Sequence, residues 1–180
     1  MTAEPLELVL PTDDDTRDLG RRLAPLLRAG DLVLLSGDLG AGKTTLTQGL
    51  GEGLQVRGQV TSPTFVIARV HPSLVEGPAL VHVDAYRLGG IEELDDLDLD
   101  TSLDSAVTVV EWGEGVAEGL ADTRLEVALS RGHGVDGATA PAGEALGPVA
   151  DTDPRTVRIT PVGERWTGAD LAAALSPHAG

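Results

Sequence analysis

A glycine-rich octapeptide constrains the fold of this chain more than any other feature. Residues 37–44 read Gly-Asp-Leu-Gly-Ala-Gly-Lys-Thr and satisfy the pattern G-x-x-x-x-G-K-[ST]. An apolar run at 32–35 lies within a strand predicted at 31–36, and a helix is predicted from about 43 to 54. A continuous apolar run is typical of a strand buried on both faces of a parallel sheet. The sequence therefore predicts a buried strand, a tight turn and a helix in succession.

This context indicates what the turn binds. Glycines allow backbone N–H groups to point inward, and the following helix N-terminus adds positive potential, so phosphate is the expected ligand. Lys43 supplies a compact cation for the β- and γ-phosphates, and the Thr44 hydroxyl can bind Mg²⁺. The alternative is a glycine-rich strand-to-helix turn without a ligand. Nucleotide binding is the stronger interpretation, because the full pattern rarely arises by chance.

Alternating strands and helices are predicted along the rest of the chain. A strand at 6–10 precedes a helix that starts after the N-cap Thr12, and Pro25 is expected to kink or shorten this helix. A last helix is predicted near 168–175, after Thr167 as its N-cap. Further strands are predicted at 64–70, 79–84, 106–111, 125–129 and 156–160. This order predicts an α/β fold, a P-loop NTPase-like three-layer sandwich with a mostly parallel central sheet, in one domain spanning 1–180.

One segment interrupts the alternation. Residues 132–154 contain 13 Gly, Ala or Pro among 23 residues, and no Lys or Arg. Such a composition predicts a flexible insertion between two strands. A disordered binding segment is the alternative interpretation.

The charge balance excludes several classes of function. The chain has 13 Lys and Arg against 29 Asp and Glu, a net charge of −16, so direct DNA binding is not expected, and other nucleic-acid contact would need a local patch or a partner. It has no cysteine, and therefore no disulfide or thiolate metal site. No apolar stretch approaches the roughly 20 residues that span a bilayer, and the first residues lack the pattern of a secretory signal. We therefore expect a soluble, cytoplasmic protein without membrane contact.

The single lysine also bears on the choice of nucleotide. GTPases of the Ras type read guanine with the motif N-K-x-D. This chain has no Asn, and its only Lys, Lys43, is already in the glycine-rich turn. The guanine-reading motif cannot be built in that form, so ATP is the favoured nucleotide.

Two acidic residues end predicted strands. Asp84 is the last residue of the strand predicted at 79–84, and Glu111 is the last residue of the strand predicted at 106–111. The carboxyl ends of parallel strands share the edge where the phosphate turn lies, so both acids can face the nucleotide and hold Mg²⁺ or orient water. The alternative is an acid that caps a strand or pairs with Arg87. His82 is expected to pack near the site, with no pattern that makes it a metal ligand or a base.

A second threonine follows the phosphate-binding helix. In the segment Ser62-Pro63-Thr64-Phe65, Thr64 could sense the γ-phosphate as a switch segment does. An ordinary proline turn into a strand is the alternative.

Together these segments resemble the TsaE (YjeE) family, the bacterial ATPases of tRNA threonylcarbamoyladenosine biosynthesis. The resemblance covers about residues 6–129, in the family's order and approximate spacing. It rests on residues 37–45, Ser62-Pro63-Thr64-Phe65, His82-Val83-Asp84-Ala85-Tyr86-Arg87 and Val110-Glu111-Trp112. It implies a small P-loop ATPase, weakly active alone, that acts with TsaD and TsaB, which transfer threonylcarbamoyl to adenosine 37 of tRNA. ATP hydrolysis would reset that complex between turnovers, and tRNA would be contacted indirectly through the complex.

The resemblance also implies roles at matching positions. Thr44 and Glu111 would bind Mg²⁺, Asp84 would assist the metal or the water, and Thr12 matches a position near the adenine. The expected catalytic residues are Lys43, Asp84, Glu111 and Thr64. The residues expected to bind the phosphates are Gly40, Ala41, Gly42, Lys43, Thr44 and Thr45. The insertion at 132–154 is longer than the family's usual loop, which leaves open whether Arg131 or Arg155 contacts the nucleotide.

Two other functions could use the same turn. A small-molecule P-loop kinase would also need a lid that carries Arg, and the insertion at 132–154 has none. A nucleotide sensor that does not hydrolyse ATP is the second alternative.

Overall fold

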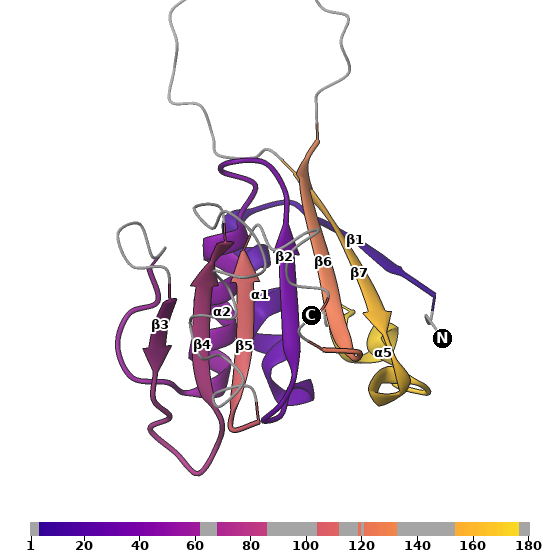
Figure 1. Ribbon diagram of the computed structural model, residues 1–180. Helices are drawn as coiled ribbons and strands as arrows, with labels where there is room; N and C mark the ends of the chain where they lie inside the picture. The colour runs from indigo at the N-terminus through magenta and orange to yellow at the C-terminus, as the bar shows by residue number, and fades with distance from the viewer. Residues whose placement is uncertain are drawn as a thin grey trace, which may run out of the picture.

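A seven-stranded sheet forms the centre of the molecule, with strand order β1-β7-β6-β2-β5-β4-β3 (Figure 1). The computed structural model describes residues 4–61, 68–85, 104–111, 119, 121–132 and 154–176. The strands are β1 (Leu6–Leu10), β2 (Leu32–Ser36), β3 (Ala68–His71), β4 (Ala79–Asp84), β5 (Ala106–Glu111), β6 (Arg124–Arg131) and β7 (Arg155–Val162). The described helices are α1 (Asp13–Leu23), α2 (Lys43–Leu54) and α5 (Leu171–Leu175), with short 3₁₀ helices η1 (Ala24–Leu26) and η4 (Glu164–Trp166).

The middle of the sheet is parallel and its edges are antiparallel. β2 pairs in parallel with β5 on one side and β6 on the other, and β4 pairs in parallel with β5. β3 and β7 run antiparallel to their neighbours, and β1 runs antiparallel to β7. The predicted α/β class with a mostly parallel sheet in the core is confirmed. In Figure 1 the arrowheads of β2, β4 and β5 point to the same edge of the sheet.

The ends of the predicted insertion are held together. β6 and β7 pair along their length, with Arg131 opposite Arg155, and the Gly132 N–H donates to the Pro154 carbonyl oxygen at 2.9 Å. Both strands extend beyond the predicted 125–129 and 156–160. The insertion therefore joins two paired strands, as predicted, while the residues between 132 and 154 lie outside the described part of the chain.

Helices α1 and α2 cover one face of the sheet (Figure 1). Leu19 and Leu23 of α1 and Leu46 and Leu50 of α2 have no exposed surface, and they share one core with side chains of the strands. Burying each leucine contributes about 1.5–3 kcal/mol relative to leaving it exposed. Leucine packing is therefore what fixes α2, and with it the turn before α2, against the sheet.

A second buried core lies on the opposite face of the sheet. It includes Leu32 and Leu34 of β2, Val81 and Val83 of β4, and Val110 of β5. These residues alternate along the strands with residues of the first core, so they point to the other side. Both faces are buried, in agreement with the predicted three-layer sandwich.

The N-cap predicted for the first helix is present. The Thr12 hydroxyl oxygen accepts from the Asp15 N–H at 3.2 Å, and the Asp15 carboxylate accepts from the Thr12 N–H at 3.0 Å. This reciprocal pair satisfies two backbone donors that a helix start leaves unpaired. α1 ends at Leu23, before Pro25, which lies in η1. The expected shortening at Pro25 is confirmed.

The prediction for the last helix was wrong at its start. Thr167 has extended backbone at the end of η4, and the N-cap is Asp170, whose carboxylate accepts from the Ala173 N–H at 2.9 Å. Gly168, at φ +79°, separates the two short helices. The strand predicted at 64–70 is described as Ala68–His71, and residues 62–67 lie outside the described ranges. None of the described helices is long and apolar enough to span a membrane.

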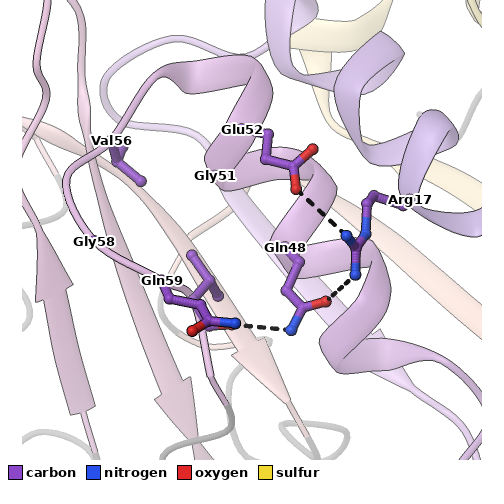
Figure 2. A pocket seen from close by; sticks show the side chains of 8 residues that line it. Arg17, Gln48, Gly51, Glu52, Val56, Gly58 and Gln59 are labelled. Atoms are coloured by element: carbon purple, nitrogen blue, oxygen red, sulfur yellow. Dashed lines mark hydrogen bonds and ion pairs between the residues drawn. The ribbon is translucent and has the colours of Figure 1, made fainter.

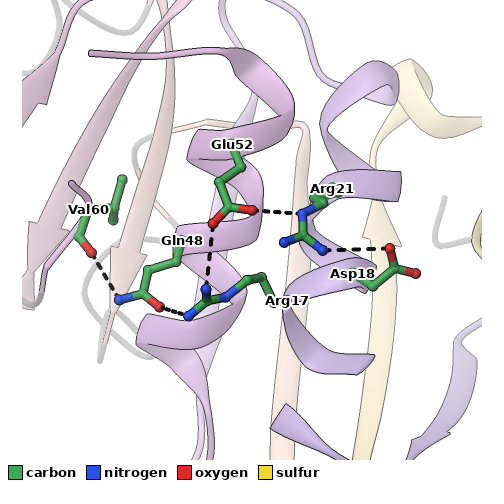
Figure 3. A network of polar contacts seen from close by, with 6 residues as sticks. All are labelled: Arg17, Asp18, Arg21, Gln48, Glu52 and Val60. Atoms are coloured by element: carbon green, nitrogen blue, oxygen red, sulfur yellow. Dashed lines mark hydrogen bonds and ion pairs between the residues drawn. The ribbon is translucent and has the colours of Figure 1, made fainter. Parts of the chain in front are cut away.

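Charged side chains link α1 to α2 at the surface. Arg17 donates to the Gln48 side-chain oxygen at 2.8 Å and lies 3.7 Å from Glu52, which also accepts from Arg21 at 2.7 Å (Figure 3). Gln48 in turn donates to the Val60 carbonyl oxygen at 3.1 Å. Arg17, Gln48 and Glu52 line a pocket of about 150 Å³ beside the chain at 56–60 (Figure 2). Since Arg17, Arg21 and Glu52 are more than a third exposed, these ion pairs are weak individually.

Close packing of α1 on α2 gives a test of the fold. A Cβ at Gly20 would stand 2.4 Å from the Leu46 carbonyl oxygen and 2.7 Å from the Leu50 nitrogen. Gly-to-Ala in an exposed helix stabilises by about 1 kcal/mol, whereas we expect Gly20→Ala to lower the free energy of unfolding by about 1–3 kcal/mol. Urea denaturation measures the difference.

The control for this substitution is Gly77→Ala. A Cβ at Gly77 would meet nothing nearer than the Ser73 hydroxyl at 3.6 Å, so we expect a change within about 0.5 kcal/mol. A stabilising Gly20→Ala would contradict the close approach of the two helices.

Candidate phosphate-binding site

The glycine-rich turn leaves the end of β2 and enters α2. Its last glycine, Gly42, is the N-cap of α2 and has φ +107°, a backbone conformation that L side chains rarely adopt. Its first, Gly37, approaches β6 so closely that a Cβ there would stand 2.3 Å from the Leu129 carbonyl oxygen. The glycines at these two positions are therefore required by backbone conformation and by space. The turn presents the N-terminus of a 12-residue helix, which favours an anion.

The ammonium group of Lys43 lies inside this turn. Lys43 is 5% exposed, and its Nζ donates to the carbonyl oxygens of Gly37 at 2.7 Å and Asp38 at 2.9 Å. Burial lowers the pKa of Lys43 below its ordinary value, and the negative charges of Glu111, Asp38 and Asp84 oppose that shift. The turn therefore holds a cation at the start of α2, where its charge adds to the helix dipole.

The two acids predicted at strand ends lie side by side. Asp84 of β4 is paired in register with Glu111 of β5, which is also opposite Leu35 of β2. Because β2 leads directly into the glycine-rich turn, both acids reach the sheet edge from which the turn departs. Glu111 is 3% exposed and Asp84 is half-buried.

These groups fit a magnesium ion by their chemistry. The carboxylates of Asp84 and Glu111 and the hydroxyl of Thr44 are hard oxygen donors, which Mg²⁺ prefers. In the described ranges, no three His, Cys, Asp or Glu side chains converge on one point. A donor set this small suits Mg²⁺, which usually keeps waters and substrate phosphate oxygens among its ligands.

The start of α1 lies against the same turn. Buried Arg155 forms an ion pair with Asp13, the first residue of α1, and its Nε is 3.2 Å from where a Cβ on Gly42 would stand. The methyl group of Thr16 is 3.4 Å from the same point. Thr12, the residue expected near the adenine, therefore caps a helix whose first turn touches the phosphate turn. Its hydroxyl also donates to Asp15 at 2.6 Å.

Arg131 and Arg155 had no role that the sequence alone could assign. Arg131, at the end of β6, donates from Nε to the Gly40 carbonyl oxygen at 3.0 Å. Arg131 thus bonds to the glycine-rich turn and Arg155 lies close to Gly42, each on one of the two strands that flank the insertion. The sequence shows an arginine on each side of the insertion, which could have suggested that both belong to the site. Only the pairing of β6 with β7 shows that the two residues lie next to each other.

A third residue had no assigned role. His82, two residues before Asp84, is fully buried, and its Nε2 lies 2.9 Å from Glu111 Oε1. His82 and Asp84 are two residues apart on one strand, so their side chains lie on the same face of the sheet. This spacing could have indicated from the sequence that His82 lies near the acidic residues. Of the other predicted site residues, Thr64 lies outside the described residues, as do Arg87 and the aromatic residues of the motif segments.

Comparison with known proteins identifies the family. Residues 10–136 match the family described as "Threonylcarbamoyl adenosine biosynthesis protein TsaE". This match spans the glycine-rich turn, Asp84 and Glu111. The chain belongs to the TsaE family.

Individual relatives support this membership. The "tRNA threonylcarbamoyladenosine biosynthesis protein TsaE" of Streptomyces coelicolor is 62% identical over 157 residues, which are 87% of this chain and 97% of the relative. A TsaE protein of Mycobacterium bovis is 54% identical over 129 residues, 68% of this chain and 77% of the relative. The crystal structure of Bacillus subtilis YdiB superposes with a TM-score of 0.68 at 30% identity, covering 98% of this chain and 96% of that one. The fold is thus shared over nearly the whole chain.

The backbone of the turn can be tested through Gly42. Gly42→Ala combines a side chain at φ +107° with contacts at 3.2 Å to Arg155 and 3.4 Å to Thr16. Gly58→Ala is the matched control, because Gly58 has φ +82° and nothing lies within 4 Å of its added Cβ. We expect Gly58→Ala to cost about 1–2 kcal/mol of backbone strain, and Gly42→Ala to cost more. Thermal and urea unfolding measure both, and equal losses would contradict a contact between Arg155 and the turn.

Proposed function

We propose that this chain binds ATP with Mg²⁺ and hydrolyses it as a component of the machinery that makes threonylcarbamoyladenosine in tRNA. The observation that carries the proposal is the placement of Lys43, a buried cation inside a glycine-rich turn, next to two strand-end carboxylates. Membership of the TsaE family supports the pathway, since the relatives with that printed name belong to tRNA threonylcarbamoyladenosine biosynthesis.

The choice of ATP rests on which residues the chain lacks. A guanine-reading N-K-x-D motif needs an Asn and a second Lys, and the chain has neither. Thr12, at the start of the helix that touches the turn, would lie near the adenine. Residues 40–45 would surround the phosphates with backbone N–H groups, and the Lys43 ammonium would neutralise charge on the β- and γ-phosphate oxygens.

The two acidic residues would bind the metal ion and orient the attacking water. Thr44 and Glu111 would hold Mg²⁺, which supplies positive charge beside the phosphates when bound. Asp84 would orient the attacking water or assist the metal from its neighbouring position. Thr64 would sense the γ-phosphate. Proximity and charge stabilisation account for most of the catalysis of phosphoryl transfer, so a site of this kind needs no covalent nucleophile.

The partners in the proposal are TsaD and TsaB. ATP hydrolysis would reset the TsaD–TsaB complex between turnovers, and the tRNA would be held by the complex. A net charge of −16 supports this division, because the chain repels a phosphate backbone and would leave tRNA binding to a partner. Participation in this pathway would put the protein in the cytoplasm.

Nucleotide binding and hydrolysis can be separated by two substitutions. We expect Lys43→Ala to weaken MgATP binding about 10- to 100-fold, because charge-assisted hydrogen bonds to phosphate are lost. We expect Glu111→Ala to keep metal-free ATP binding and to lose turnover. Isothermal titration and phosphate release, alone and with TsaD and TsaB, measure the two effects.

Arg158→Ala is the charge-matched control, because Arg158 is exposed on β7, 3.9 Å from Glu7, and does not belong to the glycine-rich turn. Undiminished MgATP binding by Lys43→Ala would contradict the site. Binding without any hydrolysis, even with TsaD and TsaB, would point to a nucleotide sensor. Transfer of the γ-phosphate to a small molecule would point to a kinase.

The partner part of the proposal has its own test. We expect tagged protein to retain TsaD and TsaB in a pull-down with ATP more strongly than with ADP, and Lys43→Ala to remove that difference. Absence of retention with either nucleotide would contradict the partner assignment and leave the ATP site standing.

A further inference from the structure

We propose that His82 is a positioning residue, which fixes the Glu111 carboxylate in the orientation that a divalent metal requires. This inference rests on the proposed function, because it takes Glu111 as a metal ligand. It adds to the site a residue, His82, to which the sequence motifs gave no role. His82 is fully buried, and its only hydrogen bond among the described residues joins Nε2 to Glu111 Oε1 at 2.9 Å.

The register of the strands explains why His82 reaches Glu111. Asp84 is opposite Glu111, and His82, two residues earlier, is opposite Val109. His82 and Glu111 therefore point to the same face of the sheet as diagonal neighbours on adjacent parallel strands. β4 thus carries two residues next to Glu111: Asp84 beside it at the edge, and His82 below it in the core.

The chemistry of the pair gives the bond a direction. An ionised carboxylate only accepts hydrogen bonds, so His82 donates its Nε2–H to Oε1. This bond restrains rotation of the carboxylate and leaves Oε2 available to a ligand. Carboxylates that bind metals are commonly held by such outer hydrogen bonds, and losing the outer partner typically weakens metal binding about 10- to 100-fold.

Burial makes the bond necessary. Glu111 is 3% exposed, and a carboxylate removed from water needs both compensating charge and hydrogen bonds. Lys43 supplies charge from the glycine-rich turn, and His82 supplies a hydrogen-bond donor from the opposite side, inside the sheet core. The Glu111 carboxylate would thus be held between the His82 donor in the core and the glycine-rich turn at the edge of the sheet.

A second buried histidine provides a matched control. His71 of β3 is 5% exposed, lies opposite Leu80 of β4, and donates from Nδ1 to the Arg57 carbonyl oxygen at 3.2 Å. It therefore faces the same core as His82, one strand farther from Glu111. Replacing His71 removes a histidine of similar burial that lies beside His82 but makes no hydrogen bond to Glu111 among the described residues.

The experiment measures metal affinity directly. Mn²⁺ is titrated into the full chain with saturating ADP, and free Mn²⁺ is followed by electron paramagnetic resonance. We expect His82→Leu to raise the Kd for Mn²⁺ at least about 10-fold and to leave metal-free ADP binding unchanged. His82→Gln should recover most of the affinity, because its side-chain N–H can reach Oε1. His71→Leu should keep the parent Kd.

A double-mutant cycle separates positioning from a general effect on the fold. In a Glu111→Gln background, His82→Leu should cause no further loss of Mn²⁺ affinity, because its effect passes through Glu111. If His82→Leu fails to fold, the comparison of His82→Gln with His82→Asn replaces it. The Asn amide is one methylene shorter and cannot take the place of Nε2, so only Asn should lose Mn²⁺ affinity.

Three results would overturn the inference. The first is parent-like Mn²⁺ affinity in His82→Leu while Glu111→Gln is weakened. The second is an equal loss in His82→Leu and His71→Leu, which would indicate a purely structural role. The third is Mn²⁺ affinity that does not depend on Glu111, and this result would also contradict the metal site in the proposed function.

Discussion

The buried ammonium group of Lys43 requires compensation from its surroundings, and the neighbouring elements supply it. Removing a charge from water is costly unless hydrogen bonds and opposite charges replace the solvent. The carbonyl oxygens of Gly37 and Asp38 provide the hydrogen bonds, and Glu111 provides the main opposing charge. The tight turn, the end of β5 and the start of α2 must therefore meet at one point. A change that moves any of these elements would leave a charge buried without its partner.

The sheet satisfies this requirement by register. Parallel pairing of β2, β5 and β4 aligns the turn, Glu111 and Asp84 at one edge, and the leucine packing of α1 and α2 holds the helix that carries Lys43. Apolar packing is nondirectional, and it sets how close the layers lie. The hydrogen bonds of the strands are directional, and they determine which side chains become neighbours. The placement of side chains at the site thus depends on the hydrogen bonds between strands. The stability of the fold depends mainly on apolar packing.

Much of the central fold could be predicted, because its sequence signals are local. The bounds of α2, β4 and β5 agree with the prediction, since β4 and β5 are apolar segments that end at an acidic residue of a motif, and α2 starts at Lys43 of the glycine-rich turn. The helix cap at Asp170 was missed because Thr167 and Asp170 are both acceptable caps, and the conformation of Gly168 decides between them. The contacts of Arg131, Arg155 and His82 were missed for a different reason. They depend on which strands are neighbours, and a side-chain pattern along one segment does not contain that information.

The hydrogen bond between Gly132 and Pro154 fixes the two ends of the insertion, so the structure of the sheet does not depend on how many residues lie between them. With the two ends fixed at bonding distance, the entropy of closing a loop grows only with the logarithm of its length, so doubling the length costs about 0.6 kcal/mol. We therefore expect changes in the length of the segment between 132 and 154 to alter stability little and to leave the register of β6 and β7 intact. Arg131 and Arg155, just outside this pair, would keep their contacts with the glycine-rich turn. The position of the nearby site thus depends on the paired ends of the insertion and not on its length.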